Sequence, residues 1–291
     1  MTRARYWGHV RQGVASALAG LALLAAPAAA QVAGAVDPAL LETWRLQTGG
    51  TVRFCYYETS PTTPFDQAVG EEIAGRLLLD SSFTPLRMGY GIGGEYAAED
   101  LFIALTNDCD VMLGMGLAAN AYPQEFTVTR PYVGFSYVLV VTDPEIRAIS
   151  DIPTDQRIGA PVGSYGFIET VRYAATRPES QRWMVLPYGT EDLMLTRLLD
   201  GTIGGMVIYG PSFAALTGTD PRAQGLPVLS LEPQMTARIE AGGLLLSRNS
   251  FLRELLDDAI DSMVADGTIA RLIEEAGLEG VPNQPGGFTG N

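Results

Sequence analysis

The sequence predicts an α/β fold built as two lobes. Strands and helices alternate in two separate series, and Asp143-Pro144 breaks the pattern between them. The chain has 291 residues, 47% of them hydrophobic, so it can bury a large core and exceeds the usual size of one domain. These observations favour two α/β units over one continuous domain.

The first thirty residues have the features of a secretory signal peptide. Three arginines lie within the first eleven residues, residues 14–26 form a run of apolar and small side chains, and three alanines end at Ala30. We therefore predict cleavage after Ala30 and export to the periplasm. An uncleaved membrane anchor is the alternative, although the apolar run is short for a membrane span.

The first series of predicted elements reads strand, helix, strand, helix, strand. Strands are predicted from β-branched and aromatic content, and helices from apolar residues at helical spacing. In chain order the elements are residues 52–57, 65–79, 84–90, 99–106 and 111–115, preceded by an N-terminal extension at 31–50 with a short helix at 38–47. This order implies a parallel sheet with helices on both faces.

The second series follows a long hydrophobic strand at residues 132–141 and the break at Asp143-Pro144. It alternates strands and helices and ends on a strand and two amphipathic helices. Its elements are strands at 157–160, 184–187, 205–208 and 242–246, helices from 165 and at 191–199, and the helical pair within 251–275. The Gly/Pro-rich residues 281–291 are predicted to be a flexible tail.

Charge and missing residue types restrict the function. The net charge of −14 becomes −17 when the three signal-peptide arginines are removed, so the basic surface that nucleic-acid binding needs is absent. The single histidine, His9, lies in the signal peptide, and the chain has no lysine. Schiff-base and Ser-His-Asp chemistry are thereby excluded. We predict a protein that is not an enzyme and needs no metal or cofactor. Carboxylate-only catalysis, as in a glycosidase, stays chemically open but would need a separate domain.

Four segments of the sequence, taken in their order along the chain, resemble the corresponding segments of type II periplasmic solute-binding proteins of family 3. They cover a third strand, a Pro-Tyr segment entering a crossing strand, a Gly-Ser at a helix start, and a paired helix and strand. The strings are CDVMLGM (109–115), TRPYVGFSYVLVV (129–141), ISDIPTDQRIGAPVGSYG (149–166) and YGTEDLMLTRLLDGTIGGMVIYGP (188–211). The resemblance extends over roughly residues 52–278.

That resemblance implies two lobes joined by crossing strands, with a small-molecule ligand held in the cleft between them. The first lobe would comprise residues 51–142 and 240–280, and the second residues 143–239. The partners would be the ligand and the membrane permease of an ABC transporter, and we expect a monomer. Ligands of open α/β sheets bind beyond the carboxyl ends of the strands, which agrees with such a cleft.

Two departures bear on the ligand. Amino-acid-binding members of the family carry an arginine after the third strand, and residues 116–124 contain none. They also carry an aspartate at the end of a second-lobe strand, where this chain has Tyr209. Without these partners for a carboxylate and an ammonium group, a standard amino acid is disfavoured. Cys109-Asp110, the string TRPY (129–132) and Tyr209-Gly210-Pro211 are similar to a branch of the family associated with periplasmic quinoprotein (methanol or alcohol) dehydrogenases. This similarity implies an accessory role for such a dehydrogenase as the alternative.

The predicted ligand contacts lie at strand ends and helix starts. Aromatic residues would offer stacking surfaces, Arg130 a charge, and Ser164 a helix N-terminus for an anion. Ordinary structural roles compete: Ser164 as an N-cap, Met115 as core, and Arg130 in a surface salt bridge. The predicted set is Tyr57, Phe65, Met115, Leu117, Arg130, Ser164, Tyr165, Tyr209 and Gly210.

Cys55 and Cys109 are the two cysteines of the chain. An oxidising compartment favours a disulfide between them. If the first and third strands start at the same level, however, Cys55 lies late in one strand and Cys109 at the start of the other. A rise of about 3.3 Å per residue then weighs slightly against a bond.

Overall fold

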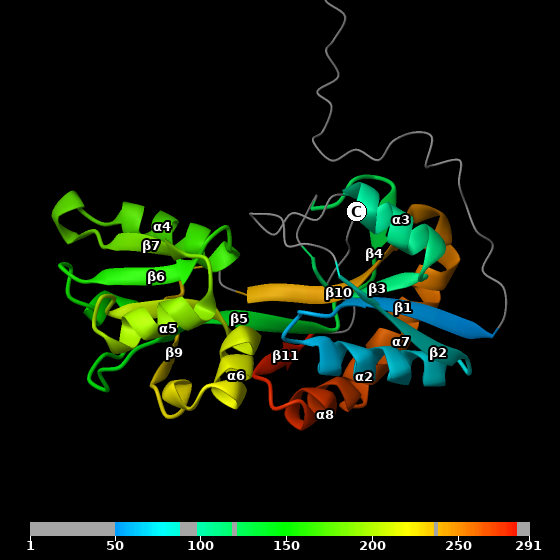
Figure 1. Cartoon of the computed structure of the whole chain (residues 1–291). Helices are drawn as coiled ribbons and strands as arrows, with labels where there is room; N and C mark the ends of the chain where they lie inside the picture. The colour runs from blue at the N-terminus through cyan, green and yellow to red at the C-terminus, as the bar shows by residue number, and fades with distance from the viewer. Residues whose placement is uncertain (1–49, 88–97, 118–120, 236–237, 284–291) are drawn as a thin grey trace, which may run out of the picture. The chain divides into compact units, whose positions relative to one another are not determined.

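The computed structural model describes residues 50–87, 98–117, 121–235 and 238–283 (Figure 1). The predicted signal peptide, nearly all of the N-terminal extension and the predicted helix at 38–47 lie outside these residues. The described helices are α2 (Thr63–Arg76), α3 (Ala98–Asn107), α4 (Tyr165–Thr176), α5 (Glu191–Leu199), α6 (Gly210–Thr219), α7 (Ser250–Ala265) and α8 (Thr268–Glu275). No helix in the described part of the chain is long and apolar enough to span a membrane.

Eleven described strands form one sheet. They are β1 (Thr51–Tyr57), β2 (Asp80–Leu86), β3 (Val111–Gly116), β4 (Phe126–Val128), β5 (Val133–Val140), β6 (Arg157–Pro161), β7 (Met184–Tyr188), β8 (Gly205–Tyr209), β9 (Val228–Ser230), β10 (Arg238–Leu246) and β11 (Gly280–Pro282). The main order is β2-β1-β3-β10-β5-β8-β6-β7, with β4 paired to β10 and with β9 and β11 paired to β5.

Strand β5 joins the two halves of this sheet. Its residues 133–136 pair antiparallel with β10, and its residues 137–140 pair antiparallel with β8. The first half contains the parallel strands β1, β2 and β3, and the second half contains the parallel strands β6, β7 and β8. Two parallel α/β units therefore meet at one shared antiparallel strand.

Helices cover both faces of each half, because the strands are apolar on both sides. In β1, Phe54 packs in a core cluster with α2, α7 and α8, whereas Tyr57 packs in the cluster with α3. In β8, Val207 faces the cluster that includes α4, and Ile208 faces the cluster with α5 and α6. Figure 1 shows α3 on the opposite side of β1 and β3 from α2 and α8. The predicted helices on both faces are confirmed.

The structure corrects some predicted boundaries. Helix α2 ends at Arg76 because Leu78 adopts a left-handed conformation (φ 56°), so β2 begins at Asp80, four residues before the predicted start. Three further elements, β4, β9 and α6, lie in segments for which no helix or strand was predicted. Strand β11 pairs with β5, so the start of the predicted flexible tail is an ordered strand, and residues 284–291 lie outside the described part.

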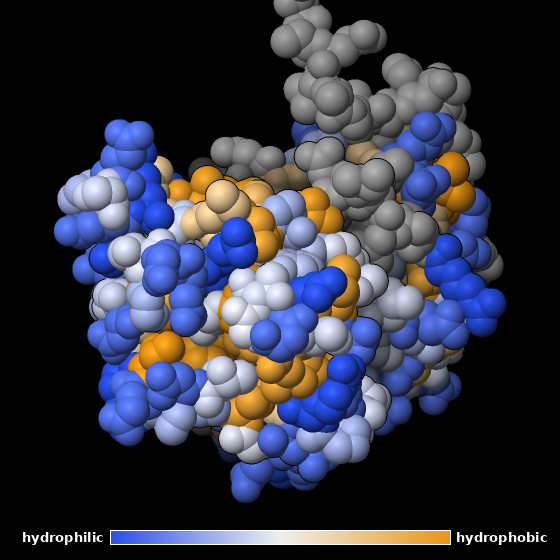
Figure 2. Space-filling model, turned by 60° about the vertical axis from the view of Figure 1, so that its left-hand side comes forward, coloured by the Kyte–Doolittle hydropathy of each residue, from blue (hydrophilic) through white to orange (hydrophobic). Residues whose placement is uncertain are grey.

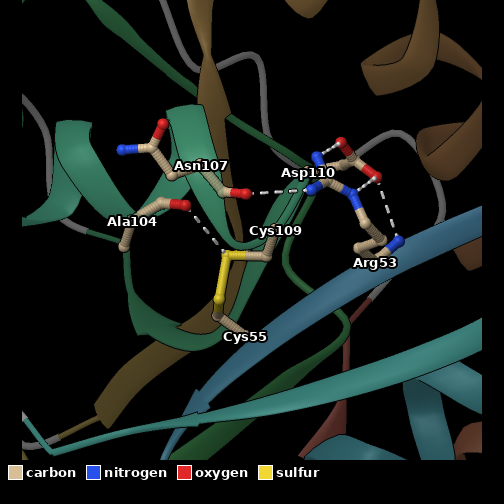
Figure 3. The surroundings of a disulfide bond; sticks show 6 residues. All are labelled: Arg53, Cys55, Ala104, Asn107, Cys109 and Asp110. Atoms are coloured by element: carbon tan, nitrogen blue, oxygen red, sulfur yellow. Dashed lines mark hydrogen bonds and ion pairs between the residues drawn. A yellow bond between two sulfur atoms is a disulfide. The ribbon is translucent and has the colours of Figure 1, made fainter. Parts of the chain in front are cut away.

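Cys55 and Cys109 form a disulfide, with Cα atoms 5.6 Å apart (Figure 3). The expectation against this bond was wrong because the strand starts are not level. Strand β3 begins with Val111 opposite Phe54, and Cys109 lies in the bend just before it. The bend is fixed by Asp110, whose N–H donates to the Arg53 carbonyl at 2.7 Å and whose carboxylate pairs with the Arg53 guanidinium.

Candidate functional site

Four of the predicted ligand residues are buried. Tyr57, Met115 and Leu117 belong to the core cluster of α3, and Phe65 packs in the cluster of α2, α7 and α8. None of the four is more than 7% exposed. Their contact with a ligand stays a prediction, while core packing accounts for their burial in the structure.

Arg130 is engaged by helix α7. Its guanidinium pairs with Asp261, and its backbone N–H donates to the Asp257 carboxylate at 2.7 Å. The salt bridge considered for Arg130 on sequence grounds is thus present, to a carboxylate that is itself partly buried. Arg130 therefore connects the segment before β5 to α7, which is a structural role.

The start of α4 carries two more predicted residues. Ser164 is the N-cap, and its Oγ accepts a hydrogen bond from the Phe167 N–H at 3.1 Å. Gly163 before it has φ +70°, the left-handed conformation that glycine adopts without strain. Tyr165 is 38% exposed, and burial together with the nearby Glu169 carboxylate raises the pKa of its hydroxyl. The N-cap role of Ser164 is confirmed, and Tyr165 offers a ring to the surface.

A series of aromatic contacts connects α2 with α4 across the sheet. The ring centroids of Phe65 and Phe135 lie 5.7 Å apart, those of Phe135 and Tyr209 6.1 Å, and those of Tyr209 and Tyr137 5.5 Å. Tyr137 then lies against Gly166 of α4, where a Cβ would meet its ring at 2.4 Å. Phe135 and Tyr137 were not predicted as site residues, although their alternation along 133–140 placed them on one side of the strand.

Tyr209 and Gly210 occupy the junction of β8 and α6. Tyr209 is the N-cap residue of α6 and packs against both core clusters that meet at β5. A Cβ on Gly210 would come within 2.9 Å of the Ser136 carbonyl, so the β8–α6 turn can pass β5 only with glycine there. Tyr57 belongs to a different cluster, so the structure does not unite Tyr57 and Tyr209 in one group of packed side chains.

Asp66 is a buried carboxylate at the start of α2. Its two oxygens accept hydrogen bonds from the Thr62 hydroxyl at 2.6 Å and the Tyr132 hydroxyl at 2.7 Å. The Tyr132 oxygen in turn accepts the Gly114 N–H at 2.8 Å. Burial raises the pKa of Asp66 to about 6, although both hydroxyl hydrogen bonds act in the opposite direction. The group ties the β1–α2 turn to β3 and to the residue before β5.

The raised pKa of Asp66 predicts a specific pH dependence of stability. A carboxyl group that titrates near 6 in the folded chain and near 3.8 when unfolded stabilises the fold most below pH 4. That contribution is lost as the pH rises through 6. Compared with Asp66→Asn, the wild type should lose about 2–3 kcal/mol of unfolding free energy between pH 4 and pH 7. Urea unfolding of both proteins at several pH values measures this difference, and parallel curves would contradict it.

The structure also contains a cavity of about 810 Å³. It lies against β5, α6, β9 and the segment that leads into β11. Its lining includes the polar or charged residues Ser136, Thr217, Ser230, Glu232, Arg238 and Glu279, with apolar residues such as Phe213, Val228, Leu231 and Met235 between them. Gly210 is the one predicted ligand residue in this lining. A smaller cavity of about 320 Å³ lies between α3, Glu125 and Arg248.

Metal binding has no support in the described part of the chain. No group of three or more His, Cys, Asp or Glu side chains there is arranged to hold a metal ion. The two cysteines are bonded to each other, so their sulfur atoms are not thiolate ligands.

Comparison with known proteins identifies the fold. No protein-family model matches the chain, and no curated protein matches its sequence. Among solved structures, a probable amino-acid ABC transporter extracellular-binding protein of Bacillus subtilis matches with a TM-score of 0.62 and 15% identity, over 79% of this chain and 97% of that one. The unliganded, open L-cystine solute receptor of Neisseria gonorrhoeae matches with a TM-score of 0.60 and 20% identity, over 81% and 95%. An ancestral cationic amino-acid solute-binding protein matches with a TM-score of 0.56 and 18% identity, over 78% and 95%.

The chain has the α/β fold of the two-lobed periplasmic binding proteins. The predicted fold class is thus confirmed. Most of these neighbours are binding proteins, and one is described as an ancestral amino-acid-binding protein that was a precursor of cyclohexadienyl dehydratase. At identities of 15–20% the likeness shows the fold, and each neighbour's ligand is a property of that neighbour.

Proposed function

We propose that this protein captures a small molecule between two lobes, without catalysis, and delivers it to the membrane permease of an ABC transporter. The observation that carries the proposal is the extent of the fold likeness. The match covers 97% of the Bacillus binding protein, so nothing of that protein's architecture beyond a few residues is missing here. A fold by itself hosts several functions, so the proposal needs the further support given below.

The sheet supports the proposed lobes. The boundary between residues 142 and 143 falls just after β5, the strand that both halves of the sheet share. The proposed point at which the chain re-enters the first lobe, residue 240, falls within β10, the neighbour of β5 in the first half of the sheet. The chain thus changes from one α/β unit to the other at adjacent antiparallel strands, as lobes with a common hinge require.

The chemistry of the chain supports binding over catalysis. Beyond the predicted cleavage site the sequence has no histidine and no lysine, which removes the commonest general base and the Schiff-base nucleophile. The buried disulfide suits an oxidising compartment such as the periplasm. These features agree with an exported protein that recognises its ligand by contacts alone.

We further propose that the ligand is not a standard amino acid. Residues 116–124 contain no arginine for a ligand carboxylate, and Arg130 nearby is already engaged by Asp261. Strand β8 ends at Tyr209, whose ring packs against Phe135 and Tyr137, so no carboxylate stands there for a ligand ammonium. A zwitterion would lose both of its charged partners.

Calorimetry on the protein from Gln31 onward tests this proposal. We expect no standard L-amino acid to bind with a dissociation constant below roughly 10 μM, and at least one compound of a wider solute panel to bind more tightly. Tyr165→Ala should weaken that compound severalfold, whereas Phe251→Ala, which removes an exposed aromatic ring from α7, should not. Submicromolar binding of an amino acid would contradict the inferred ligand class, and a panel without any binder would count against solute capture.

The alternative is an accessory role for a periplasmic quinoprotein dehydrogenase. It is favoured by Tyr209-Gly210-Pro211 after β8 and by the Thr129–Tyr132 string, both similar to that branch. A thermal-shift screen with pyrroloquinoline quinone, calcium and lanthanide ions separates the two roles, because any ligand of the folded state raises the melting temperature. Stabilisation by the quinone alone would favour the accessory role.

A further inference from the structure

The cavity of about 810 Å³ is separate from most of the predicted cleft. It is formed by four parts of the chain that are far apart in sequence: the middle of β5, α6, residues 228–235 together with Arg238, and residues 277–281. Its lining contains neither Ser164 nor Tyr165, and from β5 it includes Ser136, Tyr137 and Val138. Its volume lies within the range of sites that hold small organic molecules.

The lining of this cavity carries more negative than positive side chains. The Arg238 guanidinium is held by the Glu240 carboxylate at 2.6 Å and lies over Gly134 of β5, so its charge is already compensated. Two carboxylates, Glu232 and Glu279, also line the cavity. Within the described ranges neither of them forms an ion pair with an arginine. An uncompensated negative charge therefore remains at the cavity.

Glu232 is also fixed in position. Its Oε1 accepts a hydrogen bond from the Ser150 hydroxyl at 2.8 Å, and Ser150 belongs to the short 3-10 helix Ile149–Asp151. Residue 232 as a whole is partly buried, and the hydrogen bond itself is exposed. A carboxylate held in this way loses little conformational entropy when a cation binds to it, which favours a specific contact over diffuse attraction.

The rest of the wall is apolar. Phe213 of α6 and Met235 are nearly buried, while Val228 of β9 keeps 42% of its surface exposed. Figure 2 shows hydrophobic residues at the surface, in the lower half of the view. They lie at the same height as α6 and β9 in Figure 1. A ligand that covers this wall would remove apolar surface from water, which favours the complex.

We propose that this cavity binds a small organic cation, a protonated amine carried on a hydrocarbon body. The ammonium group contacts Glu232 and Glu279, and the hydrocarbon covers Phe213, Val228 and Leu231. An anion of the same shape is repelled by the two carboxylates, and a neutral molecule leaves them without a partner. The site goes beyond the proposed function because, apart from Gly210, its lining residues are not among those expected to hold the transported solute.

Three probes of one length test the charge preference: hexylammonium, hexanoate and 1-hexanol. Titrations followed by protein NMR at 0.15 M salt and pH 7 report both affinity and the residues that respond. We expect hexylammonium to bind with a dissociation constant on the order of 0.1–1 mM, as its few heavy atoms allow. Amide signals of α6, β9 and residues 277–281 should shift. Hexanoate and hexanol should bind at least about tenfold more weakly, because the contact to a charged group is lost.

Matched variants locate the site. Glu232→Gln should weaken hexylammonium binding about tenfold, whereas Glu254→Gln, which removes the same charge from the exposed surface of α7, should leave it unchanged. Ala214→Phe places a ring in the cavity lining and should abolish binding without touching either carboxylate. Equal binding of all three probes, or equal weakening by Glu232→Gln and Glu254→Gln, would overturn the proposal. Neither result would affect the calorimetric test of solute capture, because that test concerns Tyr165.

Discussion

We expect removal of the Cys55–Cys109 disulfide to lower the free energy of unfolding by about 4 kcal/mol. The bond closes a loop between residues 54 positions apart in sequence, and the loop-closure entropy of such a cross-link gives this magnitude. Both cysteines are fully buried, so their replacement also leaves space in the cluster under α3. The double variant Cys55→Ala/Cys109→Ala should show the loss in guanidinium unfolding curves.

A reducing agent supplies the control. It should destabilise the wild type by a similar amount once the protein has been unfolded and refolded in its presence, and it should leave the double variant unchanged. A change below about 1 kcal/mol in the double variant would mean that the unfolded chain is already compact around these cysteines. The neighbouring ion pair of Arg53 and Asp110, seen in Figure 3, would then hold the β1–β3 junction by itself.

The disulfide shows where sequence reasoning stops. Periodicity predicted β1 and β3 correctly, but no feature of one strand reports its offset against another. The structure places the start of β3 opposite Phe54, and that offset decides whether the two cysteines meet. Strand register is set by packing of the whole sheet, which depends on residues far from either cysteine.

The elements that periodicity missed have a common physical cause. Strands β4, β9 and β11 are three residues long each, too short to show alternation, and they form only because β10 or β5 offers a free edge. Helix α6 begins with Gly210-Pro211, a pair that usually marks a turn. By contrast α5 was predicted with both of its boundaries, because Thr190 caps it and its apolar residues have clear helical spacing.

The fold could be predicted from the sequence, whereas the ligand contacts stay a prediction. Residue types suggested stacking rings, but whether an aromatic ring lines a cleft or fills a core depends on neighbours that the sequence does not order in space. Phe65 illustrates this, since it packs on Tyr132 and Phe135 from elsewhere in the chain. The cavity at α6 combines four distant segments and left no local pattern at all. The N-cap role of Ser164 could be predicted because its partner Phe167 lies three residues away, whereas Asp261, the partner of Arg130, could not be named from the sequence.

Gly114→Ala should strongly destabilise the first half of the sheet, by about 2–5 kcal/mol. Gly114 has φ +71°, where an alanine costs roughly 1–2 kcal/mol. Its new Cβ would also lie 2.5 Å from Asp66 Oδ2, so the buried carboxylate must move away from the Thr62 hydroxyl. Disturbing a buried hydrogen bond adds about 1–3 kcal/mol. Thermal and urea unfolding of the variant measure the total.

Two further variants separate the two causes of this loss. Gly116→Ala, in the same strand, has an ordinary φ and brings its Cβ only to 3.3 Å from a methyl group of Ile239, so it should cost less than about 1 kcal/mol. In an Asp66→Ala background the contact with the carboxylate is gone, and Gly114→Ala should then cost only the roughly 1–2 kcal/mol of its backbone conformation. If the cost is the same with and without Asp66, the carboxylate does not constrain residue 114. The close approach of Asp66 to β3 would then have no part in requiring glycine there.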